Sequence, residues 1–191
     1  MRRIFLILAA ATLAAPAMAD GLSYNYLEGG YQRIELDDDI FDVDGDGFGI
    51  GGSFELGQNA FVFASYGTAD FDLGVDFDEL VAGVGYHAPV GTNTDFVASI
   101  AYVRAEADAG SFGSVDDSGI GASIGLRSMV TDTVEVFGNI NYVDLDDSGD
   151  ETSFGGGAWF NVTDTFALGV NVGFGDDTTT YGAGARLYFG R

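Results

Sequence analysis

The feature that most constrains this chain is a two-residue alternation between apolar residues and small or polar residues, repeated along most of its length. From Phe48 to Leu56 the even positions are mostly apolar and the odd positions are glycine, serine or glutamate, and the stretch from Phe166 to Phe174 alternates in the same way. Because successive side chains of a β-strand point to opposite faces of the sheet, this pattern predicts strands with one apolar face. Helical spacing explains none of these stretches, so we expect an all-β protein.

Reading the whole chain in this way gives ten candidate strands, with eight as the alternative number. We expect them near residues 22–35, 47–56, 61–68, 78–88, 95–104, 117–128, 133–144, 153–162, 166–175 and 180–189. The connections alternate between tight turns and mostly longer acidic segments. Bacterial outer-membrane barrels have this asymmetry, with short periplasmic turns and long extracellular loops.

The two faces of the expected strands indicate a membrane barrel and not a soluble one. A soluble barrel keeps its apolar face inside and shows charged residues outside. Here the non-apolar face is mostly glycine, serine and asparagine, and the apolar face carries no mid-strand charge in the clearest strands. Aromatic residues near the strand ends fit two interfacial girdles, among them Tyr86, Phe96, Phe160, Phe166, Tyr102 and Tyr142. The sequence therefore predicts an antiparallel, up-and-down transmembrane β-barrel.

The first 19 residues have the order of a secretory signal peptide. Arg2 and Arg3 precede an apolar run, and the small-residue triplet Ala17-Met18-Ala19 follows it. We expect cleavage after Ala19, so that residues 1–19 are the signal peptide and residues 20–191 form the barrel. The sequence contains no cysteine, so no disulfide framework holds the domain together.

The charge of the chain bears on its partners. The formal net charge is −23, and most of the acidic residues gather in the longer connections. Such a surface repels nucleic acid, so we expect no nucleic-acid partner. We expect instead a location in the bacterial outer membrane, with lipopolysaccharide around the acidic loops.

The C-terminal strand carries a separate signal. Gly184, Leu187 and Phe189 match the glycine, hydrophobic and aromatic positions that substrates of the bacterial barrel-assembly machinery carry at their C-termini, although Gly190 and Arg191 extend beyond the pattern. This resemblance implies that the assembly machinery is a partner, through a strand that ends at Phe189.

Three segments carry a family resemblance. GLSYNYLEGGY, DGDGFGIGGS and DFDELVAGVGY resemble a proteobacterial family of small outer-membrane β-barrel proteins, some of which bear quorum-sensing or signal-related names. The resemblance spans most of the expected mature chain in strand order and loop acidity. It implies the fold and the location, and it brings no catalytic residues with it.

One motif suggests a cation site. Asp42, Asp44 and Asp46, followed by Gly47, have the spacing of the first half of a calcium loop. The position where a bidentate glutamate would follow is Ser53, so half of the site is missing. The alternatives are a solvated acidic loop and weak binding of Ca²⁺ or Mg²⁺, which lipopolysaccharide would share. We expect no other cofactor.

His87 is the only histidine, so any hydrolase of the Ser-His kind would have to use it. Cross-strand counting over the turn at Gly91 places it near Asp95, with both side chains facing inward. We interpret these two residues as a structural pair, with catalysis as the alternative.

Two further pairs are expected inside the barrel. Counting over the turn at Val130 brings Arg127 opposite Glu135, and Arg186 on the last strand is expected to face Glu28 on the first. These pairs, together with an inward Trp159, either plug the lumen or line a small pore, and we favour the plug.

The parity of two strands is less clear. In the first strand we place Glu28 inward and Leu27 and Tyr31 outward, and the third strand, with Phe61, Phe63 and Tyr66, cannot be phased from sequence.

Taken together, the residues predict a monomeric, non-enzymatic outer-membrane barrel with a structural or surface-interaction role, whose acidic extracellular loops are candidates for binding divalent cations. One alternative is a narrow, passive, porin-like channel. The other is an outer-membrane hydrolase.

Overall fold

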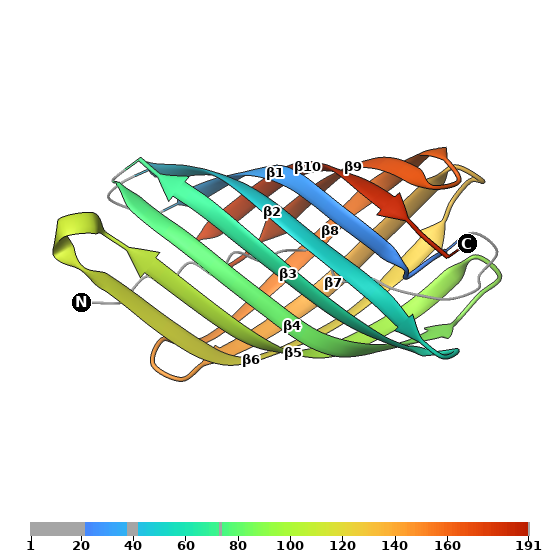
Figure 1. Ribbon diagram of the computed structural model, residues 1–191, viewed down its shortest axis with the longest axis horizontal. Coiled ribbons are helices and arrows are strands. Elements are labelled where there is room, and N and C mark those ends of the chain that lie inside the picture. Colours follow the sequence, from blue (N-terminus) through green and yellow to red (C-terminus); the bar gives the residue numbers. More distant parts are fainter. Residues whose placement is uncertain (1–21, 38–41, 73, 191) are drawn as a thin grey trace.

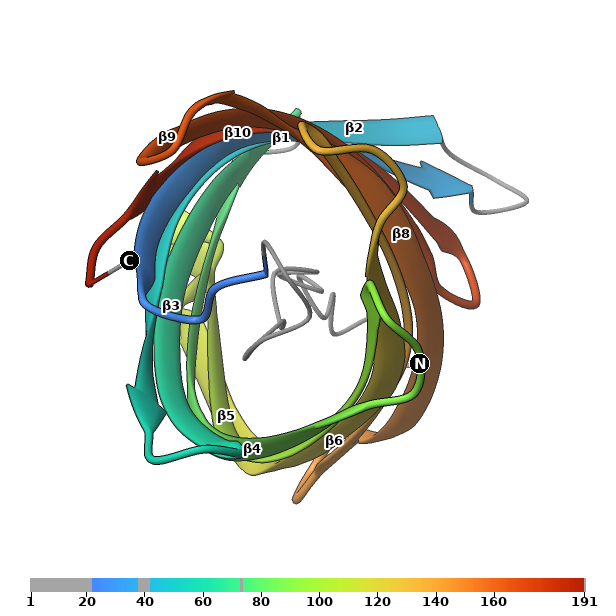
Figure 2. The same cartoon turned by 90° about the vertical axis from the view of Figure 1, so that its right-hand side faces the viewer.

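The computed structural model describes residues 22–37, 42–72 and 74–190, and these form ten antiparallel strands closed into a barrel (Figures 1 and 2). A short 3₁₀ turn, η1 (Gly110–Phe112), lies between the fifth and sixth strands. The strands are β1 (Tyr26–Asp37), β2 (Asp42–Leu56), β3 (Ala60–Phe71), β4 (Val75–Pro89), β5 (Thr94–Asp108), β6 (Ser114–Met129), β7 (Val134–Leu145), β8 (Gly149–Thr163), β9 (Phe166–Phe174) and β10 (Thr178–Tyr188).

Each strand pairs with its neighbours in the sequence, and β1 pairs with β10 to close the ring. The prediction of ten strands is confirmed, and the alternative of eight is wrong. The expected signal peptide lies outside the described residues. Over the part of the chain that the structure describes, no helix is long and apolar enough to cross a membrane.

The connections at the two ends of the barrel differ in length. The β2–β3, β4–β5, β6–β7 and β8–β9 turns share one end with the C-terminus, and the β5–β6 hairpin with η1 projects at the other end (Figure 1). Several strands run further into the acidic segments than expected. β2 begins at Asp42 and β5 ends at Asp108, where the sequence predicted limits at residues 47 and 104.

The outer face of the barrel is apolar through its middle. Phe48, Ile50 and Phe54 of β2 are each more than half exposed, as the alternation predicted. Leu27 and Tyr31 point outward and Glu28 is buried inside, which confirms the facing assigned to the first strand. The parity of β3 is now settled, with Phe61 and Phe63 inside and Tyr66 outside.

The end of the barrel opposite the short turns carries most of the acidic residues, and we call it the acidic end. Toward this end the polarity of both faces is reversed. On β1, Arg33 and Glu35 take the outward positions while Ile34 is buried inside. On β5, Arg104 is exposed and Ala105 is buried. A tilted strand needs only about 10 residues to cross a bilayer, whereas these strands have 12 and 15 residues. We infer that their acidic ends stand in water above the membrane.

Glycine on the inner face makes room for aromatic rings from the neighbouring strand. Phe61 pairs directly with Gly85, and a Cβ atom on Gly85 would lie 1.9 Å from Cζ of that ring. The same relation recurs in four other directly paired couples, Phe63–Gly83, Phe71–Gly45, Phe137–Gly157 and Trp159–Gly169. The glycine content of the strands is therefore a packing requirement of a narrow lumen.

Candidate functional site: a layer of side chains across the lumen

Charged side chains form a layer across the lumen of the barrel, near the end with the short turns. Glu28, Arg127, Glu135, Arg186 and Asp95 all occupy inward positions of their strands, and each is at most 7% exposed. Burying a charge is costly unless it is paired, so the partners of these groups determine whether such an interior is stable.

The first pair is Arg127 with Glu135. Arg127 Nε donates to Glu135 Oε1 at 2.5 Å, and Nη2 donates to Oε2 at 2.8 Å. The strand register places Arg127 opposite Phe137, and Glu135 opposite Met129, so the two charged side chains meet diagonally across the β6–β7 hairpin. The predicted contact is present, but the predicted directly opposite register is wrong by two residues.

The second pair is Glu28 with Arg186. These residues are directly opposite each other on β1 and β10, and Nε and Nη2 of Arg186 donate to Glu28 Oε2 at 2.9 Å and 2.7 Å. The predicted contact is therefore present. Arg186 Nη1 also lies 3.8 Å from Glu135 Oε1, which joins the two pairs into one network across the barrel.

Aromatic rings cover the Arg186 guanidinium. Its Cζ lies 4.0 Å from the ring centroid of Tyr26, 4.1 Å from that of Trp159 and 5.8 Å from that of Tyr188. Such contacts between a cation and a π-system are stronger where water is excluded. Trp159 points inward, as the sequence predicted, and belongs to the network.

The segment before β1 completes the layer. Tyr24 is fully buried, its hydroxyl donates to Asp95 Oδ2 at 3.1 Å, and the Cζ atom of Arg127 lies 4.7 Å from its ring centroid. Tyr24 lies within the first candidate strand, residues 22–35, and the sequence assigned it no role. The signal that could have located it is its parity with the inward Glu28.

His87 lies beside this tyrosine. The His87 and Tyr24 ring centroids are 5.0 Å apart, and His87 Nδ1 is 3.9 Å from Asp95 Oδ2. The predicted proximity of His87 and Asp95 is confirmed. Both side chains are inaccessible to solvent, and neither ring nitrogen has a hydrogen-bond partner among the described residues. This geometry suits a packed structural pair and offers a substrate no access.

The predicted calcium loop has a different conformation. Residues 42–47 belong to strand β2, and the side chain of Asp42 lies outside the described residues. Asp44 and Asp46 point outward toward Arg33, whose Nη2 is 2.5 Å from Asp44 Oδ2 and whose Nη1 is 3.6 Å from Asp46 Oδ1. Within the described residues, no group of three or more acidic, histidine or cysteine side chains could hold a metal ion. The expected loop conformation is absent because strand pairing extends through this segment, and cation binding by these carboxylates stays a prediction.

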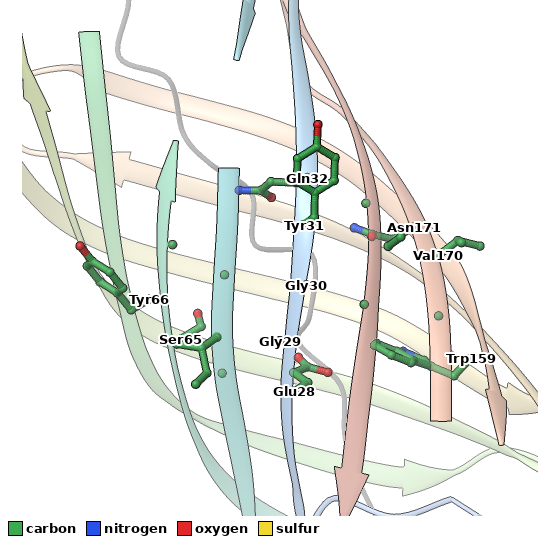
Figure 3. Close-up of a pocket in the computed structure, with 18 of the residues that line it drawn as sticks. Glu28, Gly29, Gly30, Tyr31, Gln32, Ser65, Tyr66, Trp159, Val170 and Asn171 are labelled. Atoms are coloured by element: carbon green, nitrogen blue, oxygen red, sulfur yellow. The ribbon is translucent and has the colours of Figure 1, made fainter. Parts of the chain in front are cut away.

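A cavity of about 80 Å³ lies inside the barrel next to the charged layer. Glu28 and Trp159 belong to both the layer and the cavity wall, together with the polar side chains of Gln32, Ser65 and Asn171 and several backbone glycines. Figure 3 shows Ser65 on one side of β1 and Trp159 and Asn171 on the other. The layer thus separates this cavity from the end with the short turns.

An apolar outer face, a closed ring of strands and a polar interior define the class of bacterial outer-membrane β-barrels, because in lipid every backbone polar group has to be satisfied within the sheet. The chain matches the model of the outer membrane protein β-barrel domain over residues 5–176. It belongs to that family, and its location is the bacterial outer membrane.

Three solved structures are similar to this chain at low sequence identity. The translocator domain of the autotransporter NalP from Neisseria meningitidis has a TM-score of 0.52 and 9% identity, covering 90% of this chain and 91% of that chain. The KdgM porin has a TM-score of 0.47 and 14% identity, with 85% and 99% coverage. The attachment invasion locus protein Ail of Yersinia pestis has a TM-score of 0.44 and 16% identity, with 85% and 97% coverage. The likeness to NalP shows the fold alone, and no curated protein sequence matches the chain.

Proposed function

We propose that this protein is a closed, non-enzymatic outer-membrane barrel that acts through its extracellular surface as a structural or surface-interaction protein. The observation that carries the proposal is the uninterrupted series of contacts across the lumen, from Asp95 through Tyr24, Arg127 and Glu135 to Arg186. A layer of paired charges and aromatic rings leaves little room for free passage of solutes. The porin-like alternative requires an open path in the native state.

Conductance of the native protein tests this proposal. Wild-type barrel inserted in a planar lipid bilayer is expected to show no steady ion conductance, while heat modifiability on a gel reports that it is folded. A stable open channel in the folded wild type would contradict the closed barrel and favour the porin-like alternative.

The non-enzymatic part of the proposal rests on His87. A general base has to come within hydrogen-bond distance of the proton that it removes, and this imidazole is fully buried between Tyr24 and Asp95. A hydrolase activity of the purified protein that is lost in His87→Ala would overturn this part.

The extracellular surface is where we expect a partner. Outward-facing carboxylates of β3, β4 and β5 are directly paired, with Asp70 opposite Asp76 and Asp76 opposite Asp108. Like charges in direct cross-strand pairs are destabilising, and divalent cations shared with lipopolysaccharide phosphates would relieve the repulsion without a complete protein site. Asp46 likewise lies opposite Asp70, and Asp44 lies opposite Glu35. We therefore propose lipopolysaccharide-bound Ca²⁺ or Mg²⁺ as the ligand of this surface.

Vesicles with and without lipopolysaccharide separate this idea from general salt effects. Ca²⁺ is expected to raise the Tm of the wild type in vesicles that contain lipopolysaccharide, and to do so less in the double variant Asp70→Asn, Asp76→Asn. Asp132→Asn, in the short turn at the opposite end, is the matched control. An equal Ca²⁺ effect on all three proteins would remove the cation proposal.

The oligomeric state and the assembly partner stay predictions. We propose that the protein acts as a monomer, and that the assembly machinery recognises β10 together with Phe189. The signal-related names of some members of the resembling family correspond to no contact described above.

A further inference from the structure

The segment that precedes β1 enters the barrel at the end with the short turns. Figure 2, which looks into that end, shows this blue segment turning from β1 into the ring. Its two inward side chains are Leu22, which packs with Met129 of β6, and Tyr24. Tyr24 contacts Phe61 of β3, His87 of β4 and Asp95 of β5. Since the neighbours of β1 in the sheet are β2 and β10, the tyrosine reaches beyond its own part of the wall.

Tyr24 differs in this respect from most of the charged network. Arg127 and Glu135 lie on adjacent strands, as do Glu28 and Arg186, so each of these pairs can lie along the wall of the barrel. Strands that are not adjacent are bridged by Arg186, through its contacts with Trp159 of β8 and Glu135 of β7, and by Tyr24. The tyrosine ring lies against residues of β3, β4, β5 and β6.

The segment is held mainly by side chains. Sheet pairing begins at Tyr26, and just before it the carbonyl of Asn25 accepts a hydrogen bond from the backbone N–H of Phe189 at 3.0 Å. The Asn25 Oδ1 atom accepts a second from the N–H of Glu55 at 2.9 Å. Beyond this point, the described contacts of the segment with the wall come from the side chains of Leu22 and Tyr24. It can therefore leave the lumen without breaking any strand pairing.

The charges of the inner face indicate what an opened lumen would pass. The two buried arginines are neutralised by Glu28 and Glu135. Nearer the acidic end, Glu79 and Asp117 are also buried inside, and displacement of Tyr24 would uncover Asp95. Acidic side chains along a pore select cations.

We propose that the lumen is a latent pathway for small cations, closed by the N-terminal segment through Leu22 and Tyr24. The inference rests on the proposed function in one respect, because it takes the wild-type barrel to be closed. It adds an activity that the closed barrel lacks, and it assigns the closure to a segment outside the sheet.

Conductance of Tyr24→Ala in a planar bilayer tests the proposal. We expect single-channel openings that the wild type lacks, and, under a KCl gradient, a reversal potential shifted toward that of K⁺. Ser23→Ala changes the same segment but keeps Leu22 and Tyr24, so it is the matched control and is expected to stay closed. Asp95→Asn in the Tyr24→Ala background is expected to reduce the cation preference.

Several outcomes would overturn the inference. A folded, heat-modifiable Tyr24→Ala barrel that stays silent would show that the segment is not the closure, and a reversal potential on the Cl⁻ side would refute the cation pathway. Should Tyr24→Ala fail to fold, Tyr24→Leu keeps an apolar side chain at this position and is expected to open for part of the time. A silent and folded Tyr24→Leu would then overturn the proposal. If the wild type itself conducts, the closed barrel fails, and that result is distinct from a silent variant.

Discussion

Arg186 and Glu28 are 158 positions apart in the sequence and directly opposite each other where the first and last strands close the barrel, with Arg186 Nη2 2.7 Å from Glu28 Oε2. Both side chains are buried. The pairing of β1 with β10 closes the ring of strands. Closure of the sheet therefore also brings these two buried charges together.

Breaking this pair is expected to be costly. Arg186→Met leaves Glu28 buried without its cation, and removing one partner of a buried pair costs about 3–5 kcal/mol. The double variant Arg186→Met, Glu28→Met is expected to recover much of the loss, because no buried charge is then left at this point. The free energy of unfolding in urea, measured in lipid vesicles and followed by Trp159 fluorescence, reports both values.

Arg33→Met is the control for the loss of an arginine. Arg33 is paired with Asp44 on the exposed outer face, where water screens the charges, so this variant is expected to change stability little. If Arg33→Met and Arg186→Met lose the same stability, the buried network does not contribute as argued.

The aromatic rings of the lumen predict which glycines can be replaced. A Cβ atom on Gly85 would overlap the Phe61 ring, so Gly85→Ala is expected to destabilise the barrel by about 1–3 kcal/mol, the usual cost of overpacking a core. Phe61→Leu in the same chain should restore part of this loss. Gly173→Ala is the matched control, since its nearest neighbour would be Thr180 Cβ at an ordinary 3.8 Å. Equal destabilisation by both alanines would refute the packing argument.

The reversal of polarity along the strands predicts where the membrane ends. Ile50 is exposed in the middle of the apolar outer face, and Ile50→Arg is expected to cost about 2–4 kcal/mol, as for an arginine near the bilayer midplane. Phe112 is almost fully exposed in η1, beyond the strands at the acidic end of the barrel, so Phe112→Arg is expected to refold into vesicles like the wild type. Refolding yield at increasing urea measures both. A large loss for Phe112→Arg would place the membrane boundary further out than we infer.

Much of the candidate site follows from counting along the strands. Once alternation assigns an inward face, the position of a turn determines which inward residues meet across it, and so His87 with Asp95 and Arg127 with Glu135 could be predicted. The diagonal geometry of the second pair could not, because the side chains reach past their direct partners. The extension of β2 through Asp44 and Asp46 was also missed, since acidic residues in a strand above the membrane look like a loop in sequence.

The sequence by itself determined the class of this protein. A two-residue period of apolar side chains without charges, interrupted by turns, is a local property, and it has one stable solution in a bilayer, a closed ring of strands with its apolar face outward. Tertiary structure alone decided how Tyr24 completes the layer across the lumen. The place of Tyr24 against β3, β4 and β5 depends on which strands face each other across the closed ring, and no local pattern records that distance.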